Sequence, residues 1–215
     1  MINLFIIDDH ELVRMGLSRL LSEVQGFKVI AEASSGEEAL ELLSTLKPDV
    51  IIMDVKMPGI GGLEATNKIL SRSPKVKIII ISSCSEEPFP SRLLDAGASG
   101  YLTKAVALEE VVEAIRTVYA GRRYICAEIA HRKALKNSND KKDTPFIELS
   151  ERELQVMLMI TSGHNAHSIA DKLFLSPKTV NSYRYRLFDK LQVSSDVELT
   201  LLAIRYGLVD LGANE

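Results

Sequence analysis

The sequence contains little of what marks secreted or membrane proteins. It has only two cysteines, Cys84 and Cys126, which lie far apart among 215 residues and do not suggest a disulfide framework. No apolar run approaches the roughly 20 residues that a membrane-spanning helix needs. The chain starts MINLFIIDDHE, with acidic residues directly after a short apolar run, whereas a secretory signal has a basic start and a longer apolar core. These absences predict a cytoplasmic protein with reduced thiols and no membrane partner.

A strong excess of charge of one sign is also missing, since 26 lysines and arginines face 29 acidic residues. The balance argues against a protein that coats nucleic acid in general, but it leaves room for a local basic face. Residues 1–122 carry a net charge of −4, residues 123–145 carry +3 and residues 146–215 carry −2. The middle stretch ends in LKNSNDKKDTP, which is polar and lacks apolar periodicity, as linkers do. We therefore expect a first domain at 1–122, a linker with a partial helix at 123–145, and a second domain at 146–211.

Short apolar runs alternate with helical patterns through the first domain. Helix signals between the runs include Ser35 with Glu38, which is typical of a capping box, and an amphipathic stretch that ends at Gly121. The central runs are apolar on consecutive positions, as in strands that are buried on both faces of a parallel sheet. This alternation predicts a doubly wound α/β fold with a five-stranded parallel sheet. The expected strands are residues 2–7, 27–33, 49–54, 76–82 and 100–103.

Polar residues follow these strands where each one ends. Asp8 and Asp9 come after the first strand, Asp54 ends the third, Ser82 ends the fourth, and Lys104 follows the fifth. Ligands bind at this edge of doubly wound sheets. Each residue alone has an ordinary explanation as a helix cap, a turn residue or a surface lysine, so their shared position carries the argument. Clustered carboxylates suit Mg²⁺, an aspartate beside the ion can accept a phosphoryl group, and a lysine can neutralise the phosphoryl oxygens.

Competing motifs for this edge are weak. The sequence has no P-loop, no GxGxxG and no Ser-His-Asp order, and His10 is expected to be a helix-start residue rather than a base. One alternative is a Mg²⁺-dependent phosphatase or phosphotransferase of the haloacid-dehalogenase type, which also uses an aspartate at a strand end. Such enzymes need a second aspartate two residues later, where this chain has Lys56, and this argues against turnover.

The second domain has helix signals and no alternating strand pattern. Ser150 with Glu153 forms another capping-box pattern, and Ser176-Pro177 starts a helix that runs to Leu191. A short helix precedes it across the tight turn FLS, and a last helix covers residues 197–207. Four short helices with this turn predict a small all-α helix-turn-helix domain.

The helix from Pro177 to Leu191 has two distinct faces. Val180, Tyr183, Leu187 and Leu191 recur at helical spacing and are expected to be buried. The opposite face is polar and is flanked by basic residues, as in helices that contact base edges and phosphates in DNA. The predicted DNA contacts are Lys178, Thr179, Asn181, Ser182, Arg184, Tyr185, Arg186 and Lys190. The alternative is an adaptor whose last domain binds a protein partner and no DNA.

Longer motifs point to a family. FIIDDHELVRMGL, PDVIIMDVKMPGIGGLEA, IIIISS and DAGASGYLTK together resemble the receiver domain of a bacterial two-component response regulator. LSERELQVM, SIADKLFLSPKTV and LFDKL resemble the LuxR-type DNA-binding domain over residues 148–209. The combination is similar to the NarL/FixJ class of response regulators, and PFPSRLLDAGASGYLTK with SPKTVNSYRYRLFDKL looks closer still to the GacA/UvrY/LetA group.

The resemblance implies roles for the residues at the strand ends. Asp54 would be the phosphoacceptor. Asp9, Asp54 and the backbone carbonyl of Lys56 would bind Mg²⁺ directly, and Asp8 would act through water. Lys104 would contact the phosphoryl group. Ser82, where many relatives have threonine, would be the switch hydroxyl, and Tyr101 would be the aromatic residue that moves with it.

The resemblance also implies the partners. A sensor histidine kinase or its phosphotransfer domain would phosphorylate the chain, which would then form a homodimer on double-stranded promoter DNA. Promoters of small regulatory RNA genes would be among its targets. RNA polymerase would be a further partner, and the chain itself would not be an enzyme. The last helix would form a dimer contact, unless its leucines only pack within their own domain. His167 departs from relatives, which often carry lysine or glutamate there.

Overall fold

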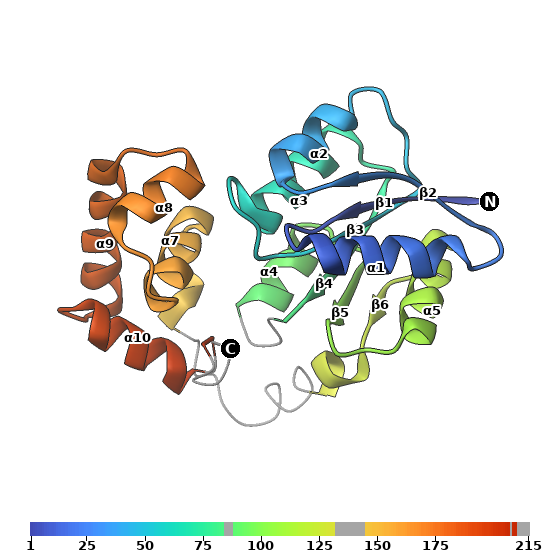
Figure 1. Ribbon diagram of the computed structural model, residues 1–215. Helices are drawn as coiled ribbons and strands as arrows, with labels where there is room; N and C mark the ends of the chain where they lie inside the picture. Colours follow the sequence, from blue (N-terminus) through green and yellow to red (C-terminus); the bar gives the residue numbers. More distant parts are fainter. Residues whose placement is uncertain (84–87, 132–144, 207, 210–215) are drawn as a thin grey trace. The chain divides into compact units, whose positions relative to one another are not determined.

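The computed structural model describes residues 1–83, 88–131, 145–206 and 208–209, and these residues fold into two compact units (Figure 1). One unit holds the elements up to residue 131 and the other holds the elements from residue 145 onward. Most of the predicted linker, residues 132–144, lies outside the described residues, as does Cys84. No helix in the described part of the chain is long and apolar enough to cross a membrane.

The first unit is a parallel sheet, which confirms the predicted doubly wound α/β class. The strands lie in the order β2-β1-β3-β4-β5-β6. Their bounds are β1 Ile2–Ile7, β2 Phe27–Ala33, β3 Val50–Met53, β4 Lys77–Ser82, β5 Gly100–Thr103 and β6 Tyr124–Ile125.

The sheet has six strands in the described residues rather than the five expected. Tyr124 pairs with Gly100 and Ile125 pairs with Tyr101, both in parallel. A two-residue edge strand is too short to leave an apolar pattern in the sequence. The sheet therefore continues into the stretch that was expected to begin the linker at residue 123, and residues 127–131 are helical.

Helices cover both faces of this sheet, and the central strands carry runs of consecutive apolar residues for that reason. Leu4 to Ile7 of β1 and all four residues of β3 are buried. Figure 1 shows α2, α3 and α4 on one side of the sheet and α1 and α5 on the other. The helices are α1 Glu11–Ser22, α2 Gly36–Leu42, α3 Gly61–Arg72, α4 Phe89–Asp95 and α5 Leu108–Tyr119.

The second unit is a small helical domain, which confirms the predicted four-helix helix-turn-helix. A short 3-10 helix, η1 (Pro145–Glu148), precedes α7 (Glu151–Thr161), α8 (Ala166–Leu173), α9 (Pro177–Leu191) and α10 (Asp196–Arg205).

The turn between α8 and α9 is set by local chemistry. Phe174 ends α8 in the left-handed region, with φ of 54°. Ser176 accepts a hydrogen bond from the Thr179 N–H, and Pro177 takes the first helical turn of α9. A serine cap followed by proline fits a helix start because the backbone nitrogens of these two positions have no intrahelical acceptor.

Candidate functional site

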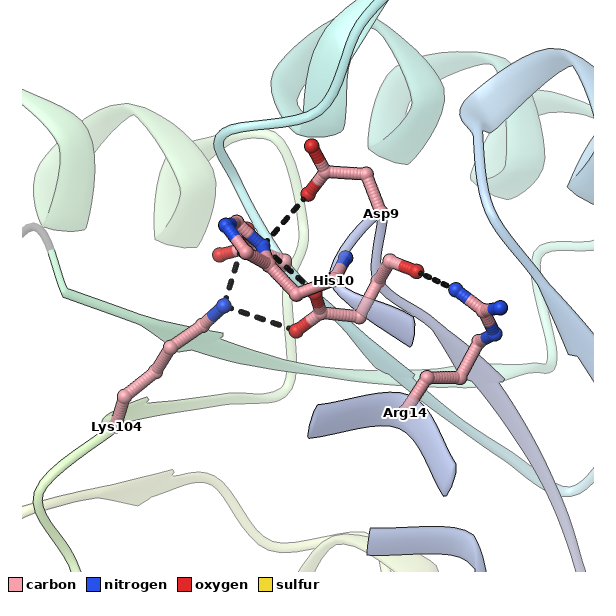
Figure 2. Close-up of polar contacts among 6 residues, drawn as sticks. Asp9, His10, Arg14 and Lys104 are labelled. Atoms are coloured by element: carbon pink, nitrogen blue, oxygen red, sulfur yellow. Dashed lines mark hydrogen bonds and ion pairs between the residues drawn. The ribbon is translucent and has the colours of Figure 1, made fainter. Parts of the chain in front are cut away.

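Three carboxylates and one ammonium group meet where the parallel strands end. Asp8 and Asp54 follow β1 and β3, and only 6% and 3% of their surfaces are exposed. Lys104 follows β5, and its Nζ lies 2.9 Å from Asp8 Oδ2 and 3.3 Å from Asp54 Oδ2 (Figure 2). Asp9 is adjacent to Asp8 and faces the same pocket. The convergence predicted from the strand ends is thus present in the fold.

The Asp54 carboxylate lies in an environment that disfavours its negative charge. Burial raises its pKa to about 6, the ammonium group of Lys104 opposes the rise, and the charge of Asp8 adds to it. Its Oδ1 atom is buried and has no hydrogen-bond partner among the described residues. A buried carboxylate oxygen without a donor is costly unless a cation or a solvent molecule reaches it.

The acidic pocket fits a divalent cation. Asp8, Asp9, His10 and Asp54 each offer a ligand atom, and these atoms all lie within 4.8 Å of one another. Oxygen-rich pockets of this kind suit hard divalent ions, which take one or two carboxylates and keep water in the remaining positions. The residues present therefore match the kind of ion that the sequence suggested.

The raised pKa of Asp54 makes stability depend on pH. Because the folded carboxyl stays protonated up to about pH 6 and the unfolded one ionises near pH 3.8, stability should fall as pH rises through this window. Asp54→Asn removes the titrating group, so we expect it to be more stable than wild type by about 2–3 kcal/mol at pH 7.5 without divalent ions. Urea unfolding from pH 4 to 8 in a chelator measures the difference. Equal stability of the two proteins at pH 7.5 would contradict this prediction.

The loop after Asp54 depends on close backbone packing. A Cβ atom at Gly62 would lie 2.5 Å from the backbone oxygen of Asp54, and Gly59 has φ of +74°. Glu37 on α2 accepts a hydrogen bond from the Ile60 N–H at 2.9 Å and so anchors the loop from outside. Two glycines and one distant carboxylate therefore hold the backbone that follows the predicted phosphoacceptor.

The two residues assigned to a switch are both buried. Ser82 ends β4, and its carbonyl oxygen accepts a hydrogen bond from the Lys104 N–H at 3.0 Å. Tyr101 lies on β5 and pairs with Ile80 of β4 on one side and with Ile125 on the other. Lys56 is exposed in the loop after β3. The β4 and β5 ends are thus joined directly beside Lys104.

Sequence reasoning missed two contacts at this rim. The Arg14 guanidinium donates to the backbone oxygen of Asp8 at 2.6 Å, and the His10 ring lies against both Asp8 and Asp9. The sequence holds one signal for these contacts, which is the four-residue spacing of His10 and Arg14 at the start of α1. This signal is weak because the same spacing occurs on ordinary helix surfaces.

The α9 helix presents several of the predicted DNA contacts to the surface. Val180, Leu187 and Leu191 are buried as expected, and Tyr183 is half-buried with the Arg186 guanidinium 4.5 Å above its ring. Tyr185 is 66% exposed. The remaining surface positions on the early part of the helix are Lys178, Thr179, Asn181 and Ser182, of which Lys178 and Ser182 are the most exposed.

Two of the predicted DNA contacts have acidic partners within their own unit. Arg184 makes a two-pronged contact with Asp196 at the start of α10, with atom separations of 2.7 and 2.6 Å. Lys190 Nζ lies 2.7 Å from Glu153 Oε2 and donates to the Glu148 carbonyl oxygen. Burial alone would raise the pKa of Glu153, but hydrogen bonds from Lys190 and Ser150 outweigh it and lower the pKa. Both cations therefore hold α9 to neighbouring elements.

The parallel α/β fold, the acidic pocket and the helical second unit are those of a response regulator, and the comparison with protein families gives the same class. Residues 4–116 match the response regulator receiver domain, and residues 148–203 match the luxR family of bacterial regulatory proteins. The chain belongs to the response regulators that join these two domains. It is 56% identical to the response regulator GacA of Pseudomonas aeruginosa, over 98% of this chain and 99% of that protein. It is 54% identical to the response regulator UvrY of Escherichia coli K12, over 97% of this chain and 96% of that protein.

Solved structures extend the likeness to the fold. A two-component response regulator of the LuxR family from Aurantimonas is 36% identical, with a TM-score of 0.63 over 65% of this chain and 99% of that one. The regulator RcsB in a complex with DNA is 26% identical, with a TM-score of 0.60 over 94% of this chain and 98% of that one.

These relationships confirm the family inferred from the motifs. The chain is a DNA-binding transcriptional regulator that is activated by phosphorylation, and its receiver domain implies a kinase as partner. The family consists of regulators rather than enzymes, so the alternative of a phosphatase is wrong. The luxR-type domain likewise favours DNA over a protein ligand for α9.

Proposed function

We propose that Asp54 accepts a phosphoryl group from a sensor histidine kinase or its phosphotransfer domain. The observation that carries the proposal is the buried Asp54 carboxylate, with one oxygen unpartnered among the described residues and the other 3.3 Å from Lys104. Asp54 provides the nucleophilic oxygen, and Lys104 offsets the charge that the phosphoryl oxygens bring into the pocket.

Mg²⁺ is the proposed cofactor of this transfer, held by Asp9, Asp54 and the backbone carbonyl of Lys56, with Asp8 acting through water. A bound Mg²⁺ neutralises negative charge on the transferring group. The loop after β3 is held near Asp54 by two hydrogen bonds, from the Ile60 N–H to the Glu37 carboxylate and from the Gly62 N–H to the Val55 carbonyl oxygen, and this restrains the Lys56 backbone between them.

Ser82 and Tyr101 are the proposed switch. A phosphoryl group on Asp54 would add charge within reach of the Ser82 hydroxyl, and that hydroxyl can donate a hydrogen bond to it. Ser82 is bonded through its carbonyl oxygen to the Lys104 N–H, and Tyr101 lies three residues before Lys104 on β5. A shift at the end of β4 would therefore reach Tyr101 through the strand pair.

The exposed early face of α9 is the proposed DNA-reading surface. Asn181 and Ser182 can hydrogen-bond base edges, and Lys178, Tyr185 and Arg186 can contact the backbone or flanking bases. Arg184 and Lys190 also stay in the proposal, but their acidic partners mean that they act partly by holding α9 in place.

Lys178→Ala should weaken DNA binding without changing which sequence is preferred, because a lysine that neutralises phosphate carries no base information. We expect a loss of about fivefold at 150 mM salt and a salt-dependence slope smaller by about one. Fluorescence anisotropy on a promoter fragment at several salt concentrations measures both. Arg19→Ala, which removes a cation from the receiver unit, is the matched control and should bind as wild type does. An unchanged slope in Lys178→Ala would exclude this phosphate contact.

The last helix is the proposed dimer contact of the DNA-binding domain. Leu199 and Ala203 of α10 are buried in their own unit, whereas Val197 and Leu201 are 69% and 60% exposed. These two apolar residues are four positions apart and share one face of α10. A self-complementary apolar face of this kind suits a two-fold dimer on paired half-sites.

Leu201→Glu should prevent phosphorylation-dependent dimers on DNA. Two like charges would face each other across the two-fold axis, so we expect binding to paired half-sites to fall at least tenfold, with binding to a single half-site unchanged. Gel-shift titrations on both DNA fragments measure this, and Thr200→Glu, on a neighbouring face of α10, is the control. Equal losses on both fragments would contradict the dimer role and indicate damage to the fold.

The wider setting follows from the family resemblance. We propose that the regulator works in the cytoplasm with RNA polymerase, at promoters that include those of small regulatory RNA genes. Transcription in vitro from such promoters, with phosphorylated and unphosphorylated protein, tests this directly. Identical transcript levels with both forms would count against it.

A further inference from the structure

His10 has a place in the acidic pocket that the proposed phosphotransfer does not use. Its ring Nδ1 lies 3.2 Å from Asp8 Oδ1 and 3.0 Å from Asp9 Oδ1 (Figure 2). Its side chain is 62% exposed, so the ring stands at the mouth of the pocket rather than in the core. The ring nitrogen and the Asp54 carboxylate belong to one cluster whose ligand atoms lie within 4.8 Å of one another.

We propose that His10 Nδ1 is a further ligand of the divalent ion in this pocket, and that it makes the site prefer octahedral transition-metal ions such as Mn²⁺ and Ni²⁺ over Mg²⁺. The inference rests on the proposed function in one respect, because Asp9 and Asp54 must hold a divalent ion. It adds a ligand and a metal preference that the phosphoacceptor chemistry does not require.

The distances suit direct coordination. In an octahedral site with metal–ligand distances of about 2.1 Å, neighbouring ligand atoms are about 3.0 Å apart. The separation of 3.0 Å from Nδ1 to Asp9 Oδ1 matches this edge length, and the hydrogen-bond contact of Nδ1 with Asp8 Oδ1 at 3.2 Å is the one that the ion would replace. One ion can therefore touch the ring and a carboxylate without a large movement of either side chain.

Local structure fixes the backbone from which the ring projects. The His10 backbone N–H donates to Asp8 Oδ1 at 2.8 Å, and its carbonyl oxygen accepts from the Arg14 N–H at 3.0 Å, which starts α1. The Arg14 guanidinium in turn donates to the Asp8 backbone oxygen. Because these bonds position the backbone of Asp8 and His10 before any ion binds, the backbone that carries the His10 ligand is preorganised.

The chemistry of the ring sets the preference. Imidazole nitrogen suits transition-metal ions, whereas Mg²⁺ prefers oxygen and readily keeps water in place of a nitrogen ligand. Coordination needs the Nδ1 lone pair, so the ring proton sits on Nε2, and a protonated ring releases one proton when the ion binds. His10 thus adds affinity for Mn²⁺ and Ni²⁺ but little for Mg²⁺.

Calorimetric titration of the full-length, tag-free protein with Mg²⁺, Mn²⁺ and Ni²⁺ tests the proposal. His10→Ala should weaken Mn²⁺ and Ni²⁺ binding about tenfold or more, since even the loss of a group that only hydrogen-bonds to a metal ligand has an effect of this size. It should change Mg²⁺ binding less than about twofold. His167→Ala, a histidine of the second unit, is the matched control and should leave all three affinities unchanged. Pulsed EPR of the Mn²⁺-loaded wild type should show coupling to a directly bound imidazole nitrogen, which His10→Ala should lack.

The other outcomes separate the possible failures. The inference would be overturned if Mn²⁺-loaded wild type showed no nitrogen coupling and His10→Ala bound Mn²⁺ and Ni²⁺ as tightly as wild type does. The Mg²⁺ proposal would still stand in that case. Tighter binding of all three ions by His10→Ala would also overturn it, because the ring would then be a competitor for the pocket. Wild type that binds none of the three ions would overturn the proposed metal cofactor and this inference together.

Discussion

Replacing Lys190 with methionine is expected to lower the free energy of unfolding by about 2 kcal/mol. Glu153 is only 2% exposed, and Lys190 supplies its nearest positive charge at 2.7 Å. Removing one partner of a fully buried pair costs about 3–5 kcal/mol, and we expect less here because 39% of the Lys190 side chain reaches solvent. Methionine keeps most of the length of the aliphatic side chain, so the loss in free energy of unfolding measures the effect of removing the ammonium charge. Urea unfolding at pH 7 measures it.

The pH dependence and a double variant make this prediction specific. Because the pKa of Glu153 is lowered in the fold, the pair stabilises the protein fully at pH values above the ordinary pKa of a glutamate. This contribution is lost as the pH falls through the lowered pKa. The difference between wild type and Lys190→Met should therefore shrink toward pH 4. Adding Glu153→Gln to Lys190→Met should recover most of the stability. A Lys190→Met protein as stable as wild type, but with weaker and less salt-dependent DNA binding, would show that Lys190 acts on phosphate instead.

Replacing Asp54 with asparagine should remove the response of DNA binding to phosphorylation. Wild type with Mg²⁺ and a small phosphodonor should gain about tenfold or more in affinity for a promoter with paired half-sites, within the usual range of coupling between two sites. Asp54→Asn should keep the affinity of the unphosphorylated protein with and without donor. Anisotropy titrations with and without the donor measure the gain.

Asp49→Asn is the matched control for this variant. Asp49 lies at the opposite end of β3 from Asp54, where its carboxylate accepts a hydrogen bond from the Asn3 N–H, and asparagine can still accept that bond. It should respond to the donor as wild type does. A gain of affinity in Asp54→Asn equal to that of wild type would place the phosphoacceptor elsewhere.

Much of the receiver rim could be predicted from the sequence because it depends on strand ends. A strand that is buried on both faces is apolar on consecutive positions, so its last residue is visible in the sequence, and parallel strands bring those ends to one edge. This pattern alone predicts that Asp8, Asp54 and Lys104 lie at the same edge of the sheet. The helix caps at Ser150 and Ser176 could be predicted for a similar reason, since they depend on residues three or four apart.

The partners of the charged side chains could not be predicted, because tertiary packing selects them. Lys190 finds Glu153 across 37 residues, and Arg184 finds Asp196 on the next helix. Glu37 reaches the loop after β3 from another helix. Nothing in the spacing of these residues distinguishes them from solvated surface charges. The sequence therefore predicts that all the basic residues of α9 are free to contact DNA, whereas in the fold two of them pair with acidic residues.

The central claim is that Asp54 becomes phosphorylated, and intact mass spectrometry tests it most directly. Wild type and Asp54→Asn are incubated with Mg²⁺ and a small phosphodonor and followed over time. The account predicts one added phosphoryl group on wild type, stable long enough to detect, and none on Asp54→Asn. An equal adduct on both proteins, or free phosphate released by wild type with no adduct at any time, would contradict it.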